Sequence, residues 1–315
     1  MPLLGYLTLL IIEPAKRPMI PAPYGPFKFS TIDRRKPLVW PNRARIAVWI
    51  ILNVEFYPLD RAMPGDSGER PKANDGGPNV RAWSQRDYGN RVGFTRLRDL
   101  LLKSGFPGTV ALNSSICDQH PQIVEDCVSS GWELMGHGRT NLTRLNDLPP
   151  GEERQEILAV TERIQRASGQ KPCGWLGVAL DQTWDTLDHL ADAGYSYVAD
   201  WVNDDQPYDI AVGERRIVSV PYTYELNDIS AIIRSKYTPV EFERMIKDQF
   251  DVLYEEGKES GRVMAIALHP YIMGQPHRIP ALARALSYIN RFEGVWKTTG
   301  SAIADHFITQ RSAID

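Results

Sequence analysis

Side chains that can transfer protons stand directly after several apolar segments of the sequence. Glu55, with Asn53 two residues before it, follows one such segment, and His137 and His269 each follow another. A carboxylate and two imidazoles can accept, hold and donate protons near neutral pH. If these segments are strands of one parallel sheet, their ends lie side by side and the three groups form an acid–base site.

The segments that would position these groups alternate along the chain. Continuous apolar runs, typical of strands buried on both faces, are followed by segments with apolar residues at helical spacing. Such alternation predicts parallel strands with right-handed crossovers. We expect an α/β fold, an irregular (β/α) barrel of about seven parallel strands, for which 315 residues suffice. Strands are expected at 46–52, 109–112, 132–135, 174–176, 197–199, 217–220, 263–268 and 295–297, helices from 93 and at 121–130, 151–168, 181–193, 238–256, 279–291 and from 300, and an irregular segment at 58–90.

Functional groups in parallel α/β barrels cluster at the carboxyl ends of the strands. The carboxylate and the two histidines are therefore expected on one rim. Trp175, Trp201 and Tyr222 stand at other strand ends and are candidates for lining a flat substrate pocket. Aromatic residues at strand ends are as often part of the core, so both interpretations stay open for these three.

Composition limits the classes of partner and the compartment. The chain is 43% hydrophobic and 24% charged, which predicts a globular protein with a large core. Its net charge of -3 argues against nucleic acid or an anionic membrane as the main partner, so we expect a small-molecule substrate. Cys117, Cys127 and Cys173 form no C-x-x-C pattern. They are expected to be buried thiols in a reducing compartment, which favours the cytoplasm.

The first 42 residues differ from the rest of the chain. The apolar run 3–12 is shorter than the ~20 residues that span a bilayer, and it lacks the basic start and cleavage site of a signal peptide. Residues 13–42 are rich in proline and predict an extended arm on a surface. We expect two parts: an N-terminal extension and arm at 1–42, and a catalytic domain at 43–315. A secretory signal at the N-terminus is the lesser alternative.

The sequence around His269 resembles that of a known family. Residues 268–278, Leu-His-Pro-Tyr-Ile-Met-Gly-Gln-Pro-His-Arg, resemble the closing motif of the polysaccharide deacetylase superfamily (NodB homology, carbohydrate esterase family 4-like). The likeness is to the branch that holds metal-independent allantoinases, cyclic imide hydrolases and an atypical peptidoglycan deacetylase. Further stretches match that branch in the same order, at 86–93, 131–138, 204–208 and 220–223.

The chain departs from the metal-binding members of this family at two positions. Those members carry paired aspartates after the first strand, where this chain has Asn53-Val54-Glu55, and an H-x-x-x-H motif, where it has His137 and Asn141. A divalent ion such as zinc takes about three anionic or imidazole ligands besides water. Glu55 and His137 alone make an incomplete metal site. The resemblance to the metal-independent branch implies no cofactor, while weak metal binding through these two residues and a third group stays open.

The resemblance also implies an activity and roles for individual residues. It implies hydrolysis of carbon–nitrogen bonds other than peptide bonds, with a cyclic ureide or imide as the first expectation. Glu55 or His137 would activate water, and His269 would protonate the leaving nitrogen. Backbone N–H groups or Tyr222 would meet the oxyanion.

Other residues are assigned to substrate binding. Arg91 is expected to anchor a carbonyl-rich or anionic substrate through its planar donor fork, together with Tyr88, unless the two residues fix the arm instead. Asn53 and Asn141 are expected to contact the substrate as well. Two alternatives remain: a metal-dependent N-acetyl-sugar deacetylase, and an inactive barrel that acts as a binding module. The resemblance further implies a homo-oligomer, a tetramer or a dimer.

Overall fold

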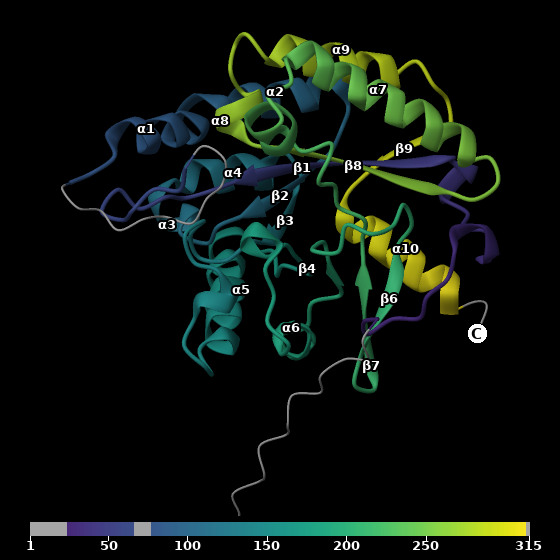
Figure 1. Ribbon diagram of the computed structural model, residues 1–315, viewed down its shortest axis with the longest axis horizontal. Helices are drawn as coiled ribbons and strands as arrows, with labels where there is room; N and C mark the ends of the chain where they lie inside the picture. The colour runs from purple at the N-terminus through teal and green to yellow at the C-terminus, as the bar shows by residue number, and fades with distance from the viewer. Residues whose placement is uncertain (1–23, 66–76, 313–315) are drawn as a thin grey trace, which may run out of the picture.

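A mostly parallel sheet of nine strands curls through the centre of the molecule as a half-barrel (Figure 1). The computed structural model describes residues 24–65 and 77–312. The strand order is β6-β7-β5-β4-β3-β2-β1-β8, with β9 paired to β1, and β6 runs antiparallel to β7. The predicted fold class is confirmed. The strands are β1 (Ile46–Val54), β2 (Gly108–Leu112), β3 (Glu133–Gly136), β4 (Gly174–Trp175), β5 (Tyr197–Val198), β6 (Tyr208–Val212), β7 (Arg215–Ser219), β8 (Arg262–Leu268) and β9 (Val295–Thr298).

Strand β1 is the centre of this sheet and is buried along its whole length. It pairs with β8 on one edge, and on the other edge with β9 at Ile46–Trp49 and with β2 from Ile50 onward. A strand covered on both faces must be apolar at every position, which is why its sequence runs without alternation. Its carboxyl end therefore emerges in the middle of the sheet, between the ends of β2 and β8.

Irregular chain covers the open side of the half-barrel. The backbone N–H of Ala267 in β8 donates to the carbonyl oxygen of Leu226 at 3.0 Å, and that of Val263 donates to Asp205 at 2.8 Å. Asn227 forms an isolated parallel bridge with Ala267. The segment that follows β7 thus lies against β8 and carries Asp228 to the end of that strand.

Helices cover the outer face of the sheet. In Figure 1, α2, α7 and α9 lie together at the top, and α5 and α6 lie at the lower left. The two shortest helices, α3 and α8, directly follow strand ends. The helices are α1 (Val80–Tyr88), α2 (Phe94–Ser104), α3 (Ile116–Gln119), α4 (Pro121–Ser129), α5 (Glu153–Ser168), α6 (Thr186–Ala193), α7 (Pro239–Glu256), α8 (Pro270–Met273), α9 (Ile279–Ile289) and α10 (Gly300–Ser312), with π-helical turns at Gly89–Gly93 and Ile229–Arg234.

The two faces of the sheet bury different sets of side chains. Residues 46, 48, 50, 52 and 54 of β1 face the core under the helices, whereas 47, 49 and 51 face the interior of the half-barrel. Ile303 and Ala304 of α10 join the interior core and close the end where the strands begin. The interior is therefore packed at that end. Polar side chains that continue the inward face past residue 51 appear at the other end.

The structure differs from the sequence predictions at several elements, among them α1, α6 and β6. Helix α1 lies in the segment expected to be irregular, and the Asn79 side chain caps its first turn by accepting from the N–H of Ala82 at 3.1 Å. Helix α6 begins at Thr186 and not at Asp181, whose carboxylate instead binds Arg144 at 3.0 Å. Strand β6 was not expected, since its hairpin with β7 has the polar outer face of a sheet edge.

Part of the predicted arm is described and lies on the barrel. The side chain of Phe27 contacts Trp201 edge to face, Arg35 binds Asp204 at 2.6 Å, and Trp40 is fully buried. Residues 1–23, which include the apolar run at 3–12, lie outside the described residues. Every helix in the described part of the chain is too short or too polar to cross a bilayer.

Candidate active site

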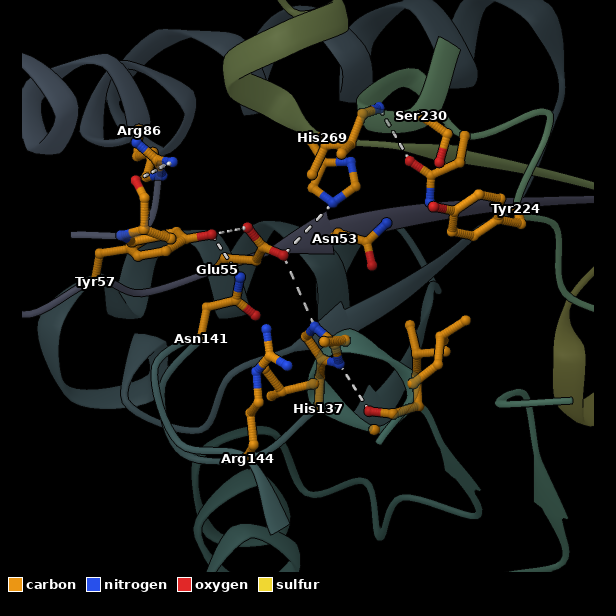
Figure 2. Close-up of a pocket in the computed structure, with 18 of the residues that line it drawn as sticks. Asn53, Glu55, Tyr57, Arg86, His137, Asn141, Arg144, Tyr224, Ser230 and His269 are labelled. Atoms are coloured by element: carbon orange, nitrogen blue, oxygen red, sulfur yellow. Dashed lines mark hydrogen bonds and ion pairs between the residues drawn. The ribbon is translucent and has the colours of Figure 1, made fainter. Parts of the chain in front are cut away.

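Glu55 lies between two imidazole rings at the carboxyl end of the sheet (Figure 2). It follows β1, while His137 follows β3 and His269 follows β8. Its Oε1 atom is 3.8 Å from Nε2 of His137 and 3.5 Å from Nε2 of His269. All three side chains are buried. The convergence of these groups on one rim, predicted from the sequence, is thus present in the structure.

His269 is held by a carboxylate on the side away from Glu55. Its Nδ1 atom is 2.7 Å from Oδ1 of Asp228, and its backbone N–H donates to Oδ2 of the same residue at 2.8 Å. Burial lowers the pKa of His269, but the negative charges of Asp228 and Glu55 outweigh it and raise this pKa to about 10. His269 is therefore an imidazolium at neutral pH, with a proton on Nε2.

His137 has the opposite arrangement of donor and acceptor. Its Nδ1 atom is 2.7 Å from the carbonyl oxygen of Leu176. A carbonyl only accepts, so Nδ1 must carry a proton, and in the tautomer that this bond selects Nε2 holds a lone pair. That lone pair faces the same cavity as the Nε2–H of His269. The site therefore offers one acceptor imidazole and one donor imidazole.

The Glu55 carboxylate is held in its ionised form. Burial raises its pKa, but the positive charge of His269 and the closeness of the two imidazoles more than offset this and hold the pKa well below its usual range. Oε2 accepts a hydrogen bond from the Tyr57 hydroxyl at 2.7 Å, and the Asn141 side-chain amide donates to the same hydroxyl oxygen. Each oxygen of the carboxylate thus has its own partners.

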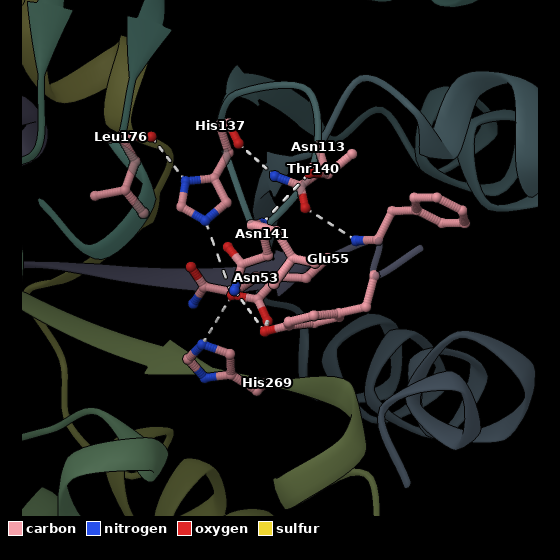
Figure 3. A network of polar contacts seen from close by, with 12 residues as sticks. Asn53, Glu55, Asn113, His137, Thr140, Asn141, Leu176 and His269 are labelled. Atoms are coloured by element: carbon pink, nitrogen blue, oxygen red, sulfur yellow. Dashed lines mark hydrogen bonds and ion pairs between the residues drawn. The ribbon is translucent and has the colours of Figure 1, made fainter. Parts of the chain in front are cut away.

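A second set of polar contacts fixes the backbone beneath these groups (Figure 3). Oδ1 of Asn113 accepts from the N–H of Phe56 at 2.9 Å, and its amide nitrogen donates to the carbonyl oxygen of His137. Asn113 therefore ties the loop after β1 to the loop after β3. The separation of Glu55 from His137 depends on this link.

The three groups line a cavity of about 170 Å³. Of the residues assigned to substrate binding from the sequence, Asn53, Asn141 and Tyr222 lie in its wall. The amide nitrogen of Asn53 and that of Asn227 each lie 3.4 Å from the Tyr222 hydroxyl oxygen. Since both amides donate to that oxygen, the hydroxyl hydrogen is left for a ligand.

Four predicted substrate-binding residues lie outside this wall, so these predictions are corrected. Arg91 sits in the π-helical turn after α1, where its side chain is 75% exposed beside Asp87. Tyr88 accepts a hydrogen bond from Arg96. The two tryptophans belong to the packing of the barrel: Trp175 faces the helices and contacts Tyr195, and Trp201 packs against Phe27 of the arm.

The sequence reasoning gave no role to Tyr57, Arg86, Arg144 and Asp228, which the structure brings to the site. Tyr57 could have been found, because 53, 55 and 57 continue the inward face of β1 at a period of two. Arg86 lies on the unexpected helix α1, with only 7% of its surface exposed. Nothing in the sequence pairs Asp228 with a histidine 41 positions later.

The side chains at the site do not fit a metal ion. Among the described residues, no group of three or more His, Cys, Asp or Glu side chains is arranged to hold one. The amide oxygen of Asn141, which has no hydrogen-bond partner among the described residues, is a neutral ligand that suits magnesium or calcium more than zinc, and the Nδ1 atom of His269 is engaged with Asp228. Glu55 and His137 are fewer ligands than zinc and similar ions take in proteins.

Comparisons with known proteins agree with the fold and the motifs. Residues 81–198 match the sequence model of the family described as polysaccharide deacetylase. A putative polysaccharide deacetylase of Schizosaccharomyces pombe is 29% identical over 291 residues, which cover 84% of this chain and 91% of that protein. The resemblance stated from the sequence is confirmed. The matched range contains His137 and Asn141 but neither Glu55 nor His269.

Two solved structures share the fold over most of both chains. The crystal structure of PuuE allantoinase superposes with a TM-score of 0.77 at 27% identity, covering 85% of this chain and 92% of that one. A probable polysaccharide deacetylase from Pseudomonas aeruginosa PAO1 gives a TM-score of 0.75 at 27% identity, with the same coverage of 85% and 92%. Proteins named for two different activities thus share this fold.

Proposed function

We propose that this chain, a hydrolase of carbon–nitrogen bonds related to the polysaccharide deacetylases in sequence and in fold, opens a cyclic amide, namely a ureide or an imide. The observation that carries the proposal is the pair of imidazoles on either side of Glu55, one with Nδ1 against a carbonyl oxygen and the other with Nδ1 against a carboxylate. Opening a cyclic amide by water needs one base and one acid within reach of the same bond.

The first step uses the acceptor imidazole. Nε2 of His137 takes a proton from water, and the water oxygen forms a bond to the carbonyl carbon. The π electrons of that carbonyl move onto its oxygen and give a tetrahedral oxyanion. The hydroxyl hydrogen of Tyr222 is available to this oxyanion, because the Tyr222 oxygen already accepts from Asn53 and Asn227.

The second step uses the donor imidazole. The carbon–nitrogen bond breaks, and the leaving nitrogen takes the proton from Nε2 of His269. The ring opens to a chain with a new carboxylic acid, so the product is the substrate plus one water. His137 then holds one proton too many and His269 one too few. Glu55 Oε1 lies 3.8 Å and 3.5 Å from the two Nε2 atoms and returns the proton between them.

The size of the cavity supports a small ring over a polymer. Its volume of about 170 Å³ is below the 300–1,000 Å³ usual for drug-sized ligands. A five- or six-membered ureide or imide fills such a space. A polysaccharide would leave most of its chain outside the wall that the described residues form.

A second candidate is hydrolysis of an N-acetyl group, which is supported by the names of two relatives that are called polysaccharide deacetylases. The same acid and base would act on an acetamide. The two reactions differ in their products, since ring opening keeps all atoms in one molecule and deacetylation releases acetate.

Mass spectrometry of the products separates the two. The purified protein would be incubated with cyclic ureides, cyclic imides and N-acetylated sugar oligomers, with and without prior dialysis against a chelator. We expect a ureide or imide product heavier by one water, with equal rates after dialysis. Release of acetate would establish the deacetylase instead. Loss of activity on dialysis would show that the reaction needs a bound metal ion and would contradict the mechanism proposed above. No product from any substrate would favour a binding module.

A further inference from the structure

The cavity wall carries more positive than negative charge. Arg86, Arg144 and the protonated His269 line it, whereas Glu55 is the one carboxylate among its lining residues in the described part of the chain. The ring-opening chemistry itself uses Glu55 and the histidines and leaves the arginines without a role. A cyclic ureide or imide without further charge would not need them.

Arg144 presents its guanidinium to the interior of the cavity. Figure 2 shows the group between Asn141 and His137. Its Nη1 atom donates to Asp181 at 3.0 Å, and that is the one hydrogen bond that the side chain makes to the described residues. A guanidinium has five N–H donors in a rigid plane. Asp181 therefore orients the fork from outside the wall and leaves most of its donors for a ligand.

Arg86 adds a second positive charge, and no carboxylate of residues 24–65 and 77–312 pairs with it. It is 7% exposed, and its Nη atoms donate to the backbone oxygens of Ala82, Pro64 and Gly65. Its Nε atom has no hydrogen-bond partner among the described residues. A buried cation with neutral partners costs free energy that a nearby anion would offset. Its field favours an anionic ligand in the adjacent cavity.

We infer that the substrate carries a carboxylate besides the ring, and that Arg144 is the specificity-determining residue that binds it. This inference rests on the proposed ring-opening function and adds the chemical class of the substrate. A carboxylate matches the planar fork in a two-point contact that neither a hydroxyl nor an amide can reproduce. Arg86 contributes through its charge, and Arg144 through direct contact.

Two matched pairs of probes test this inference. The first pair is hydantoin-5-acetate and hydantoin-5-acetamide, and the second is succinimide with a carboxymethyl or a carbamoylmethyl substituent. Within each pair, ring and size are alike and only the charge differs. Turnover and calorimetric binding would be measured for the wild type, Arg144→Gln and Asp181→Asn. Arg154→Gln, at an exposed position of α5, is the control variant.

The wild type should favour the carboxylate form by roughly 30-fold in kcat/KM, the usual worth of a charge-assisted hydrogen bond. Arg144→Gln should raise KM for that form by a similar factor, with kcat and the rates on the amide form little changed. Asp181→Asn should give a smaller rise in KM, and Arg154→Gln none.

Failure of the inference differs from failure of the proposed function. Equal turnover of both forms by the wild type overturns the inference and leaves ring opening in place. If no ring is opened, the proposed function fails and binding decides: a carboxylate form that binds the wild type but not Arg144→Gln supports an anionic ligand. Equal binding of both forms, or binding of neither, overturns the inference.

Discussion

Two glutamates stand at opposite ends of the sheet, Glu55 buried and Glu133 half-buried, and their surroundings differ in charge. Glu55 stands at the carboxyl end of the strands, here called the open end because the cavity lies there. It lies between two imidazoles, with Tyr57 on its other oxygen. Glu133 stands at the closed end, where it accepts from the hydroxyls of Tyr197 at 2.8 Å and Thr109 at 2.9 Å and from the N–H of Ser301. Neutral donors thus surround one carboxylate, and an imidazolium adjoins the other.

The pKa values of the two carboxyl groups move in opposite directions. Burial raises the pKa of Glu133, and its hydrogen bonds offset this only in part. Burial also raises the pKa of Glu55, but the charge of His269 overrides it. Neutral dipoles suffice to anchor the start of α10, whereas a charged partner is needed to keep a carboxylate ionised next to a cavity. The comparison separates a structural carboxylate from one that belongs to the chemistry.

The largest effect is expected from removing the donor imidazole at the open end. His269→Gln keeps a polar side chain of similar length but cannot protonate a leaving nitrogen. We expect kcat to fall by about 10³-fold, in the range of general acid catalysis. The matched control is His306→Gln in α10, where the ring contacts only the arm and Trp296 among the described residues. A His269→Gln enzyme that turns over within tenfold of the wild type would remove the acid from the mechanism.

The same substitution at the two glutamates gives the next largest effect. Glu55→Gln removes the charge that favours the imidazolium and the path that returns the proton, so we expect kcat to fall about 10²-fold. Glu133→Gln changes the closed end alone and should leave kcat within about twofold, as for a site without contact to the substrate. Steady-state kinetics of both variants on the same substrate measure the contrast. If kcat fell equally in both variants, Glu55 would contribute to the stability of the fold and not to the reaction.

The sequence predicted the open end better than the cavity. Glu55, His137 and His269 each follow an apolar run, and parallel strands bring such positions together whatever the helices do. The cavity wall depends on how loops turn, which no local pattern encodes. Arg91 and Tyr88 were expected in the wall, but the turn after α1 carries them away from it and leaves Arg86 there instead.

The tryptophans show a second limit of the sequence reasoning. Trp175 lies at a strand end as predicted, but a strand of two residues gives no period from which to read the face it presents. In the structure its ring faces the helices, while Leu176 faces the interior. The pairing of Asp228 with His269 depends on an irregular segment lying along β8, and only the folded chain reveals it.

A smaller effect is expected in the pH dependence of the open end. The acid must be protonated, so kcat/KM of the wild type should fall as pH rises past about 10, the raised pKa of His269. Asp228→Asn removes the nearest negative charge and should move this alkaline limb down by roughly one to two pH units, the usual effect of one adjacent charge.

Asp228 is a positioning residue in this account, and the pH profile distinguishes that role from a structural one. A merely structural Asp228 would lower activity at every pH and leave the limb where it is. The same linkage acts on stability. The raised pKa of His269 stabilises the fold fully below about 6.5, and this contribution is lost as pH rises through about 10.

The smallest expected effect is on how the free energy of unfolding depends on pH when either glutamate is replaced. Because the pKa of Glu133 is raised, its ionisation costs the folded state more than the unfolded one, so wild type should lose stability relative to Glu133→Gln as pH rises above 4.5. Because the pKa of Glu55 is lowered, wild type should instead lose stability relative to Glu55→Gln as pH falls below 4.5. Urea unfolding from pH 3 to 8 should resolve both differences, each on the order of 1 kcal/mol. If the free energy of unfolding of the two variants changed with pH in the same way, the charged neighbour of Glu55 and the neutral neighbours of Glu133 would not distinguish the two carboxylates. Only the kinetics would then separate the two ends.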